Sequence, residues 1–285
     1  MQTEKKTDKQ HINRQYKDSF FRYLFANEKN KKYTLELYNA INKTQYTDPS
    51  MIDIFLLGDA LYITMRNDVS FLIGNEIHLY EHQSTYTPNM PLRHLFYVAG
   101  LYGRYITEKK YSLLSSRRIP LPSPSFIVFY NGMKDTDKEM ILHLSDSYAD
   151  NSHPDLDLKV EMTNINLHKN HEILTSCKPL YEYSWLVNEV RTQEELTGDL
   201  GKAVESAIMK MPGSFEIHDM IHNDRKEVEK MIFFDFNDED EKRKYGESCR
   251  EEGREEGKEE MKETLITNMR SQGYSEDAIK KLLNA

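Results

Sequence analysis

The sequence is poor in the residues that build disulfide frameworks and zinc clusters. Its 285 residues include two cysteines, Cys177 and Cys249, which lie far apart and in no metal-ligand spacing. A disulfide-stapled fold and a structural zinc site are therefore disfavoured. Such sparse cysteine is typical of the reducing cytosol, and we expect a cytoplasmic protein.

Long apolar runs are also lacking. No stretch approaches the roughly 18 apolar residues that a membrane-spanning helix needs, and "MQTEKKTDKQHINRQYKDSF" at the start contains no apolar segment of a signal peptide. We therefore expect neither a membrane partner nor secretion.

Several catalytic motifs are missing as well. No glycine-rich phosphate loop precedes a helix, and no G-x-S-x-G nucleophile motif occurs. His168 and His171 have a spacing that suits a metal on a helix, but the glutamate of the metalloprotease motif is not between them. We interpret them as surface histidines.

The net charge of the chain and its local distribution of charge indicate different partners. The net charge of -9 disfavours a nucleic-acid partner when it is taken alone. Between Ser84 and Phe126, however, Glu108 is the only acid, and the basic residues there are Arg93, Arg104, Lys109, Lys110, Arg117 and Arg118. This local positive patch is either a phosphate-binding surface or a solvated face.

The pattern of the chain predicts three parts. Residues 1–14 are polar and expected to be disordered, 15–236 form one domain with a core over about 15–132 and a helix-rich part over 133–236, and 237–285 form a charged tail. In the core, "KDSFFRYLF" and "KKYTLELYNAI" have helical spacing, and "MIDIFLL" and "ALYITM" resemble strands.

A hairpin is predicted over "NDVSFLIGNEIHLYEHQ", because Gly74-Asn75 suits a two-residue turn. Counting from that turn places Leu72 opposite Ile77 and Ser70 opposite Leu79. Continued by the same alternation, the count pairs Asp68 with Glu81 and Arg66 with Gln83, all on one face. His78 and His82 then lie on the other face, where packing or hydrogen bonding is expected of them.

Two carboxylates directly opposite each other repel. About 5 Å apart in an effective dielectric of about 20, Asp68 and Glu81 would repel by roughly 3 kcal/mol. A divalent cation between them converts this repulsion into coordination, since Mg²⁺ prefers carboxylate oxygens. The alternative is a misplaced turn, or two acids that reach solvent at the rim of the sheet.

The following segments complete an α/β pattern. "NMPLRHLFYVAGLYGRYITEKK" predicts a helix with proline in its first turn. The predicted buried stripe of this helix is Leu92, Leu95, Phe96, Ala99 and Ile106. Arg93 and Arg104 lie beside the stripe, three turns apart, and are candidate DNA-binding residues. "PSFIVFYNG" is typical of a doubly buried strand, so a mixed sheet with a right-handed crossover is expected.

The second half is predicted to be mainly helical. "LDLKVEMTNINL" indicates one more strand, and "LYEYSWLVNEVR", "LGKAVESAIMKM" and "RKEVEKMI" indicate amphipathic helices, with Trp185 in the core. In the tail, "GESCREEGREEGKEEMKE" repeats every four residues. Glutamate–cation pairs favour an extended helix there and glycines oppose it. The tail is either a solvated linker, which we favour, or a homo-oligomer contact.

The motifs "NDVSF", "LYEHQS", "NMPLR" and "FIVFYNG" resemble those of the recombination-promoting nuclease (Rpn) family, also called PD-(D/E)XK nuclease family transposases. The resemblance continues through "KDSFFRYLF", "ELYNAIN", "NIN" and "LYEYS" to the glycine-repeat tail. It implies a restriction-endonuclease-like mixed central sheet flanked by helices, Mg²⁺-dependent DNA cleavage, and a role in recombination or mobile elements.

Carried over by position, the resemblance makes Asp68 the motif aspartate and Glu81 the motif acid, which are the metal ligands. Gln83 stands where the wider superfamily usually has lysine, as it does in the Rpn family. Asp18, in "KDSFFR", is an additional candidate acid on a helix near the metal. An amide can orient water but cannot stabilise hydroxide by charge, so slow turnover is expected.

Two functions therefore stand. In the first, the chain is a Mg²⁺-dependent DNA endonuclease with Asp68, Glu81 and Gln83 as its catalytic residues. In the second, it is a catalytically weak or inactive DNA- or protein-interaction module that keeps the nuclease fold. The acidic net charge, the missing lysine and the glycine-repeat tail favour the second.

Overall fold

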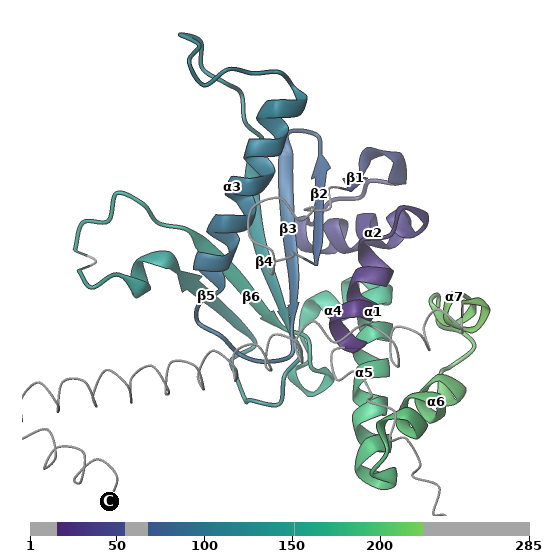
Figure 1. The fold of residues 1–285 in the computed structure, drawn as a ribbon. Coiled ribbons are helices and arrows are strands. Elements are labelled where there is room, and N and C mark those ends of the chain that lie inside the picture. The colour runs from purple at the N-terminus through teal and green to yellow at the C-terminus, as the bar shows by residue number, and fades with distance from the viewer. Residues whose placement is uncertain (1–15, 55–67, 151, 225–285) are drawn as a thin grey trace, which may run out of the picture. The chain divides into compact units, whose positions relative to one another are not determined.

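The fold is a mixed sheet with helices on both faces (Figure 1). The structure, a computed structural model, describes residues 16–54, 68–150 and 152–224. These residues lie in the first of two compact units into which the chain divides. The predicted α/β class with a mixed sheet flanked by helices is confirmed.

Six described strands form the sheet, in the order β1-β2-β3-β4-β6-β5. Their bounds are β1 Asp53–Ile54, β2 Val69–Ile73, β3 Glu76–Gln83, β4 Ser123–Tyr130, β5 Glu139–His143 and β6 Lys159–Asn164. The three central strands β3, β4 and β6 run parallel, while β2 and β5 pair antiparallel with β3 and β6. Because β5 and β6 come from the predicted helix-rich part, the sheet extends past residue 132.

Seven α-helices are described: α1 Tyr16–Phe25, α2 Lys31–Asn42, α3 Met90–Glu108, α4 Glu172–Ser176, α5 Lys178–Thr197, α6 Leu200–Lys210 and α7 His218–Asn223. Short 3₁₀ helices cover Glu28–Asn30, Pro49–Met51, Leu144–Ser147 and Leu167–Lys169. None of the described helices is both long and apolar enough to cross a bilayer. The predicted helices around 16–42, 90–108, 178–197 and 200–210 are confirmed; β5 was not predicted.

The β2–β3 hairpin has the predicted register. Gly74 adopts φ +58°, which lets the two-residue turn close, and Leu72 pairs with Ile77 and Ser70 with Leu79. After β3 the chain crosses through α3 and returns as β4, parallel to β3. Outside the described residues lie residues 1–14, Arg66, "ALYITM", the last three residues of "MIDIFLL", "RKEVEKMI" and the tail.

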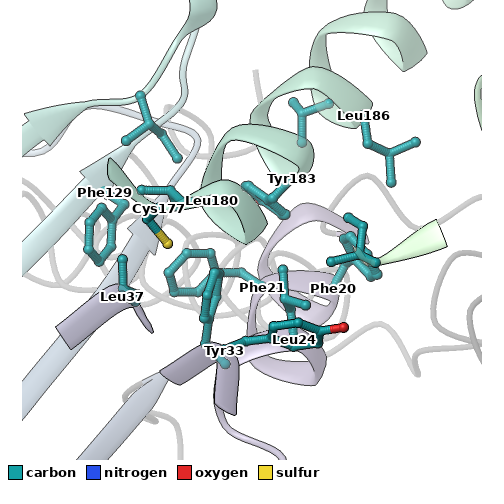
Figure 2. Packing of buried hydrophobic residues seen from close by; sticks show 14 of the residues in the cluster. Phe20, Phe21, Leu24, Tyr33, Leu37, Phe129, Cys177, Leu180, Tyr183 and Leu186 are labelled. Carbon is teal, nitrogen blue, oxygen red and sulfur yellow. The ribbon is translucent and has the colours of Figure 1, made fainter. Parts of the chain in front are cut away.

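Two apolar clusters cover the two faces of the sheet. On one face, α1, α2, α5 and α6 enclose a large core, part of which Figure 2 shows around Phe21, Tyr183 and Phe129. Trp185, predicted as core, is only partly buried at the edge of this cluster. On the other face, α3 packs over Ile77, Leu79 and Val128.

The predicted buried stripe of α3 was wrong for three of its five residues. Leu92 and Phe96 are 41% and 42% exposed, and Ala99 is also exposed, whereas Leu95 and Ile106 are partly buried. The buried residues of α3 are Met90, Pro91, His94, Tyr97, Val98 and Leu101. Both sides of this helix are apolar enough to pack, so hydropathy alone does not fix the buried side.

Candidate functional site

The candidate site lies at the end of the β2–β3 hairpin that is distant from its turn. Asp68 directly precedes β2, and Glu81 and Gln83 lie near the carboxyl end of β3. The described pairing ends at Val69 with Tyr80, and the next position of that register sets Asp68 opposite Glu81. Both acids are buried, at 8% and 2% exposure. The hairpin therefore brings the predicted acids to one end of the sheet.

Asp68 extends the hairpin ladder with its side chain. Its Oδ2 accepts the backbone N–H of His82 at 2.8 Å. A carboxylate thus takes the place that a main-chain carbonyl would occupy in a longer strand. Its Oδ1 lies 3.9 Å from Nε of Arg22, on α1. The Asp68 carboxylate is thus fixed by a hydrogen bond from β3 and faces the Arg22 guanidinium of α1.

Glu81 receives two donors on one oxygen. Nε2 of Gln83 donates to Oε1 of Glu81 at 3.0 Å, and Nη2 of Arg93 donates to the same oxygen. Arg93 comes from the first turn of α3, so the crossover helix delivers a guanidinium to the buried carboxylate. Three of the residues singled out by sequence, Glu81, Gln83 and Arg93, are in direct contact.

Tyr97, one turn along α3, completes the cluster. Its hydroxyl lies 2.9 Å from Nη2 and 3.3 Å from Nε of Arg93. Burial raises the pKa of Tyr97, and the negative charges of Glu81 and Asp68 raise it further. Burial works against the charged form of Arg93, yet Glu81, Tyr97 and Asp68 keep its pKa above the ordinary value. Both carboxylates therefore act on the same pair of α3 side chains.

Each of the two carboxylates faces an arginine in the structure. The sequence predicted that a divalent cation relieves the repulsion between Asp68 and Glu81; the structure sets Arg22 opposite Asp68 and Arg93 opposite Glu81. Arg22 and Tyr97 were not predicted. For Tyr97 a signal was present, because i and i+4 residues of a helix share a face with Arg93.

The donor set suits a hard divalent ion. Two carboxylates and an amide oxygen are the ligand types that Mg²⁺ accepts, with water completing its shell. Rotation of the Gln83 amide would present its oxygen in place of Nε2, and departure of the Arg93 guanidinium would open Oε1 of Glu81. Within residues 16–54, 68–150 and 152–224, no group of three or more His, Cys, Asp and Glu side chains is placed to hold a metal.

The remaining sequence candidates are Arg104, Asp18 and the two histidines of β3. Arg104 is on α3 but pairs with Glu108 at 2.6 Å, with both side chains about half exposed at 47%. Asp18 falls within α1, and its side chain lies outside what the structure describes. The side chains of His78 and His82 are buried on the face opposite Glu81, as predicted; Nε2 of His82 is 3.0 Å from the Tyr183 hydroxyl.

His171 is also different from its prediction. It is buried rather than on the surface, and its Nδ1 accepts the Ile173 N–H at 3.1 Å as the N-cap of α4. Its Nε2 lies 2.9 Å from Oε1 of Glu139 on β5. His168, by contrast, is exposed. The two histidines therefore do not share one metal-binding surface.

A second polar network, which the sequence did not predict, holds the strand end that carries Gln83. The N–H of Asn131 donates to the carbonyl of Gln83 at 2.9 Å. Arg191 of α5 donates to the Asn131 carbonyl and, at 2.8 Å, to Oδ1 of Asn166. Nδ2 of Asn166 donates to the Gly132 carbonyl at 3.1 Å. The main chain after β4 is thus fixed against β3 next to the candidate site.

No family model matches the chain, and neither the curated proteins nor the solved structures give a significant match.

Proposed function

We propose that this chain is a Mg²⁺-dependent DNA endonuclease of the Rpn type, with a restriction-endonuclease-like core, acting in the cytoplasm in recombination or mobile-element transfer. The observation that carries the proposal is the convergence of Asp68, Glu81, Gln83 and Arg93 at one end of the β2–β3 hairpin. A hairpin followed by a helical crossover and a parallel strand agrees with such a core at the level of fold class.

Each residue of the cluster has a role that follows from its chemistry. Asp68 and Glu81 would hold the ion, and the ion when bound supplies Lewis-acid charge stabilisation and lowers the pKa of water. Gln83, 3.0 Å from Glu81, orients the attacking water by hydrogen bonding. Arg93, once released from Glu81, is placed to hold a phosphate oxygen.

A nicking assay tests the proposal. Supercoiled plasmid is incubated with Mg²⁺ and the wild type, Asp68→Ala or Glu81→Ala; nicking should require both acids. Asp137→Ala is a matched control, because Asp137 is exposed and lies on the loop before β5. Nicking that persists unchanged in Asp68→Ala would remove this site from the reaction.

The second candidate is a DNA- or protein-interaction module that keeps the fold without cleavage. The observation that favours it is the pairing of Glu81 with Arg93, which balances the buried carboxylate without an ion. DNA binding by the wild type with no nicking under Mg²⁺, Mn²⁺ or Ca²⁺ would decide for the module.

A further inference from the structure

The loop between α3 and β4 presents two leucines to solvent. Leu113 and Leu114 are 78% and 98% exposed. In Figure 1 this loop extends past the end of α3, away from the sheet. Two adjacent leucines with so much exposed surface are more typical of a surface that contacts a partner than of a loop that only connects two elements.

The leucine pair sits at the centre of a built turn. The N–H of Ser115 donates to the Ser112 carbonyl at 3.0 Å, which makes Leu113 and Leu114 the two central residues. The Ser112 hydroxyl accepts the Leu114 N–H at 3.3 Å, and the Ser115 hydroxyl accepts the Arg117 N–H at 3.1 Å. The serines supply the polar contacts of the turn, so its closure does not require leucine at either central position.

Cations flank the leucine pair on both sides. Lys109 and Lys110 precede it, Arg117 and Arg118 follow it, and all four are exposed. Residues 109–134 contain no Asp or Glu, in a chain whose net charge is -9. In the part of the chain that the structure describes, none of these four cations forms an ion pair with an acidic side chain. We call residues 109–118 the leucine loop.

We propose that the leucine loop is a second contact with duplex DNA, in which the four cations hold backbone phosphates and Leu113 and Leu114 enter a groove between base steps. This deepens the proposed function, on which it rests for the substrate class. Phosphate contacts by Lys and Arg supply sequence-independent affinity. Leucine is one of the apolar side chains that architectural proteins insert between bases.

Position on α3 connects the leucine loop with the candidate site, whose proposed substrate is DNA. Arg93 lies in the first turn of α3 and the leucine loop follows its last turn. At about 1.5 Å per residue, the 16 residues from Arg93 to Lys109 span roughly 24 Å, which is about 7 base pairs at 3.4 Å each. One extended polyanion can therefore contact the candidate site and the leucine loop together.

Binding measured without cleavage tests the loop separately from the nuclease. Fluorescence anisotropy with a 20-base-pair duplex in EDTA compares the wild type with Arg117→Gln/Arg118→Gln and with Leu113→Ser/Leu114→Ser. The arginine variant should bind about tenfold more weakly, and its salt slope should fall by about two, at about 0.9 per phosphate contact. The leucine variant should bind more weakly with an unchanged salt slope. When the duplex contains a 2-aminopurine base, the wild type should unstack this base and raise its fluorescence, and the leucine variant should not.

The matched controls are exposed residues far from α3. Lys202→Gln/Lys210→Gln removes two exposed cations of α6, and Leu196→Ser/Met209→Ser removes two apolar side chains that are each 75% exposed. Both should bind DNA as the wild type does. All variants should keep the wild-type melting temperature, because the changed side chains make no buried contact.

The outcomes separate the two proposals. Loop-dependent binding without any nicking supports the leucine loop and contradicts the nuclease. Wild-type affinity and salt slope in both loop variants, or no DNA binding by the wild type, overturns the loop proposal whatever the nicking result. Loop-dependent sedimentation with phosphatidylserine vesicles, combined with unchanged DNA binding, would assign the loop to a membrane surface and also overturn it. A drop in wild-type affinity when the duplex is shortened below about 7 base pairs supports the span along α3.

Discussion

Arg93 of α3 donates a hydrogen bond to the buried carboxylate of Glu81 on β3, and this contact crosses the interface between the crossover helix and the sheet. The Glu81 side chain is 2% exposed and that of Arg93 is 29% exposed. An ion pair this deep is costly to break from one side, because the remaining charge stays buried. The same contact occupies Oε1 of Glu81, one of the two oxygens with which this carboxylate can bind a metal ion.

Removal of the guanidinium should therefore change stability and metal response in opposite directions. Arg93→Met leaves Glu81 without its cation and should lower the free energy of unfolding by about 3 kcal/mol. Mg²⁺ should restore much of this loss, since an ion that binds the native state stabilises it by mass action. Urea unfolding with and without 10 mM Mg²⁺ measures both effects.

Arg104→Met is the matched control, because it removes an exposed ion pair on the same helix. Its stability should change by less than about 0.5 kcal/mol, and Mg²⁺ should act on it as on the wild type. An equal response of Arg93→Met and wild type to Mg²⁺ would show that guanidinium and ion do not compete for Glu81.

The amide of Gln83 should limit the reaction in a way that lysine does not. In Gln83→Lys the ammonium can stabilise hydroxide by charge, so nicking at saturating Mg²⁺ should rise by about tenfold. The added cation beside Arg93 should also weaken Mg²⁺ binding, so the variant should be slower than wild type at low Mg²⁺. The nicking rates of Gln83→Lys and of the wild type, plotted against Mg²⁺ concentration, should therefore cross.

Gln83→Met keeps the length of the side chain and removes its hydrogen bonds. It should nick more slowly than wild type at every Mg²⁺ concentration. A Gln83→Met protein as fast as the wild type would contradict any role of the amide in orienting water.

The hairpin could be predicted from sequence because its determinants are local. Gly74 fixes the turn, and alternation then sets Leu72 against Ile77 without reference to the rest of the chain. The contact of Arg93 with Glu81 and the contact of Arg22 with Asp68 join elements that are not paired by any local rule. They depend on how α3 rotates and where α1 lies.

The rotation of α3 shows why hydropathy fell short. His94 and Tyr97 are buried, whereas Leu92 and Phe96 are more than 40% exposed. With this rotation Arg93 reaches Glu81 and Tyr97 supports it. The polar contacts of the site thus accompany a buried face that a scale of side-chain hydrophobicity would not select.

The buried His94 should make stability fall in mild acid. Burial lowers the pKa of His94 from its ordinary value of 6.5 to about 4, and the nearby Arg93 contributes to the lowering. Above pH 6.5 the histidine is neutral in both the native and the unfolded chain, so its protonation takes nothing from the free energy of unfolding. As the pH falls from 6.5 to 4, the unfolded chain takes up a proton and the native state does not. At about 1.4 kcal/mol per pH unit, the loss reaches about 3 kcal/mol.

His94→Phe should remove this pH dependence, because phenylalanine keeps an aromatic ring against Tyr97 and Phe126 and has no titrating group. The difference between the unfolding free energies of wild type and variant, followed from pH 7.5 to 4, isolates the histidine from the carboxylates. A difference curve that stays flat over that interval would mean that His94 accepts a proton in the native state.

Two glycines should respond oppositely to alanine. A Cβ at Gly132 would press on the Tyr130 hydroxyl and on the backbone carbonyl of Ser84, the residue after Gln83. Gly132→Ala should therefore cost about 2 kcal/mol of stability, as overpacking of a buried position does. A Cβ at Gly103 of α3 meets nothing within 4 Å, so Gly103→Ala should stabilise the helix by up to about 1 kcal/mol.

The double variant Gly132→Ala/Tyr130→Phe isolates the contact of the new Cβ with the Tyr130 hydroxyl. It removes the hydroxyl and keeps both the ring carbon Cζ of residue 130 and the Ser84 carbonyl, so a loss that remains in the double variant comes from these two contacts. We expect most of the loss to remain, because a backbone carbonyl cannot turn aside as a side chain can. Urea unfolding measures all three variants. Full recovery in the double variant would place the strain on Tyr130 and leave the strand end of Gln83 undisturbed.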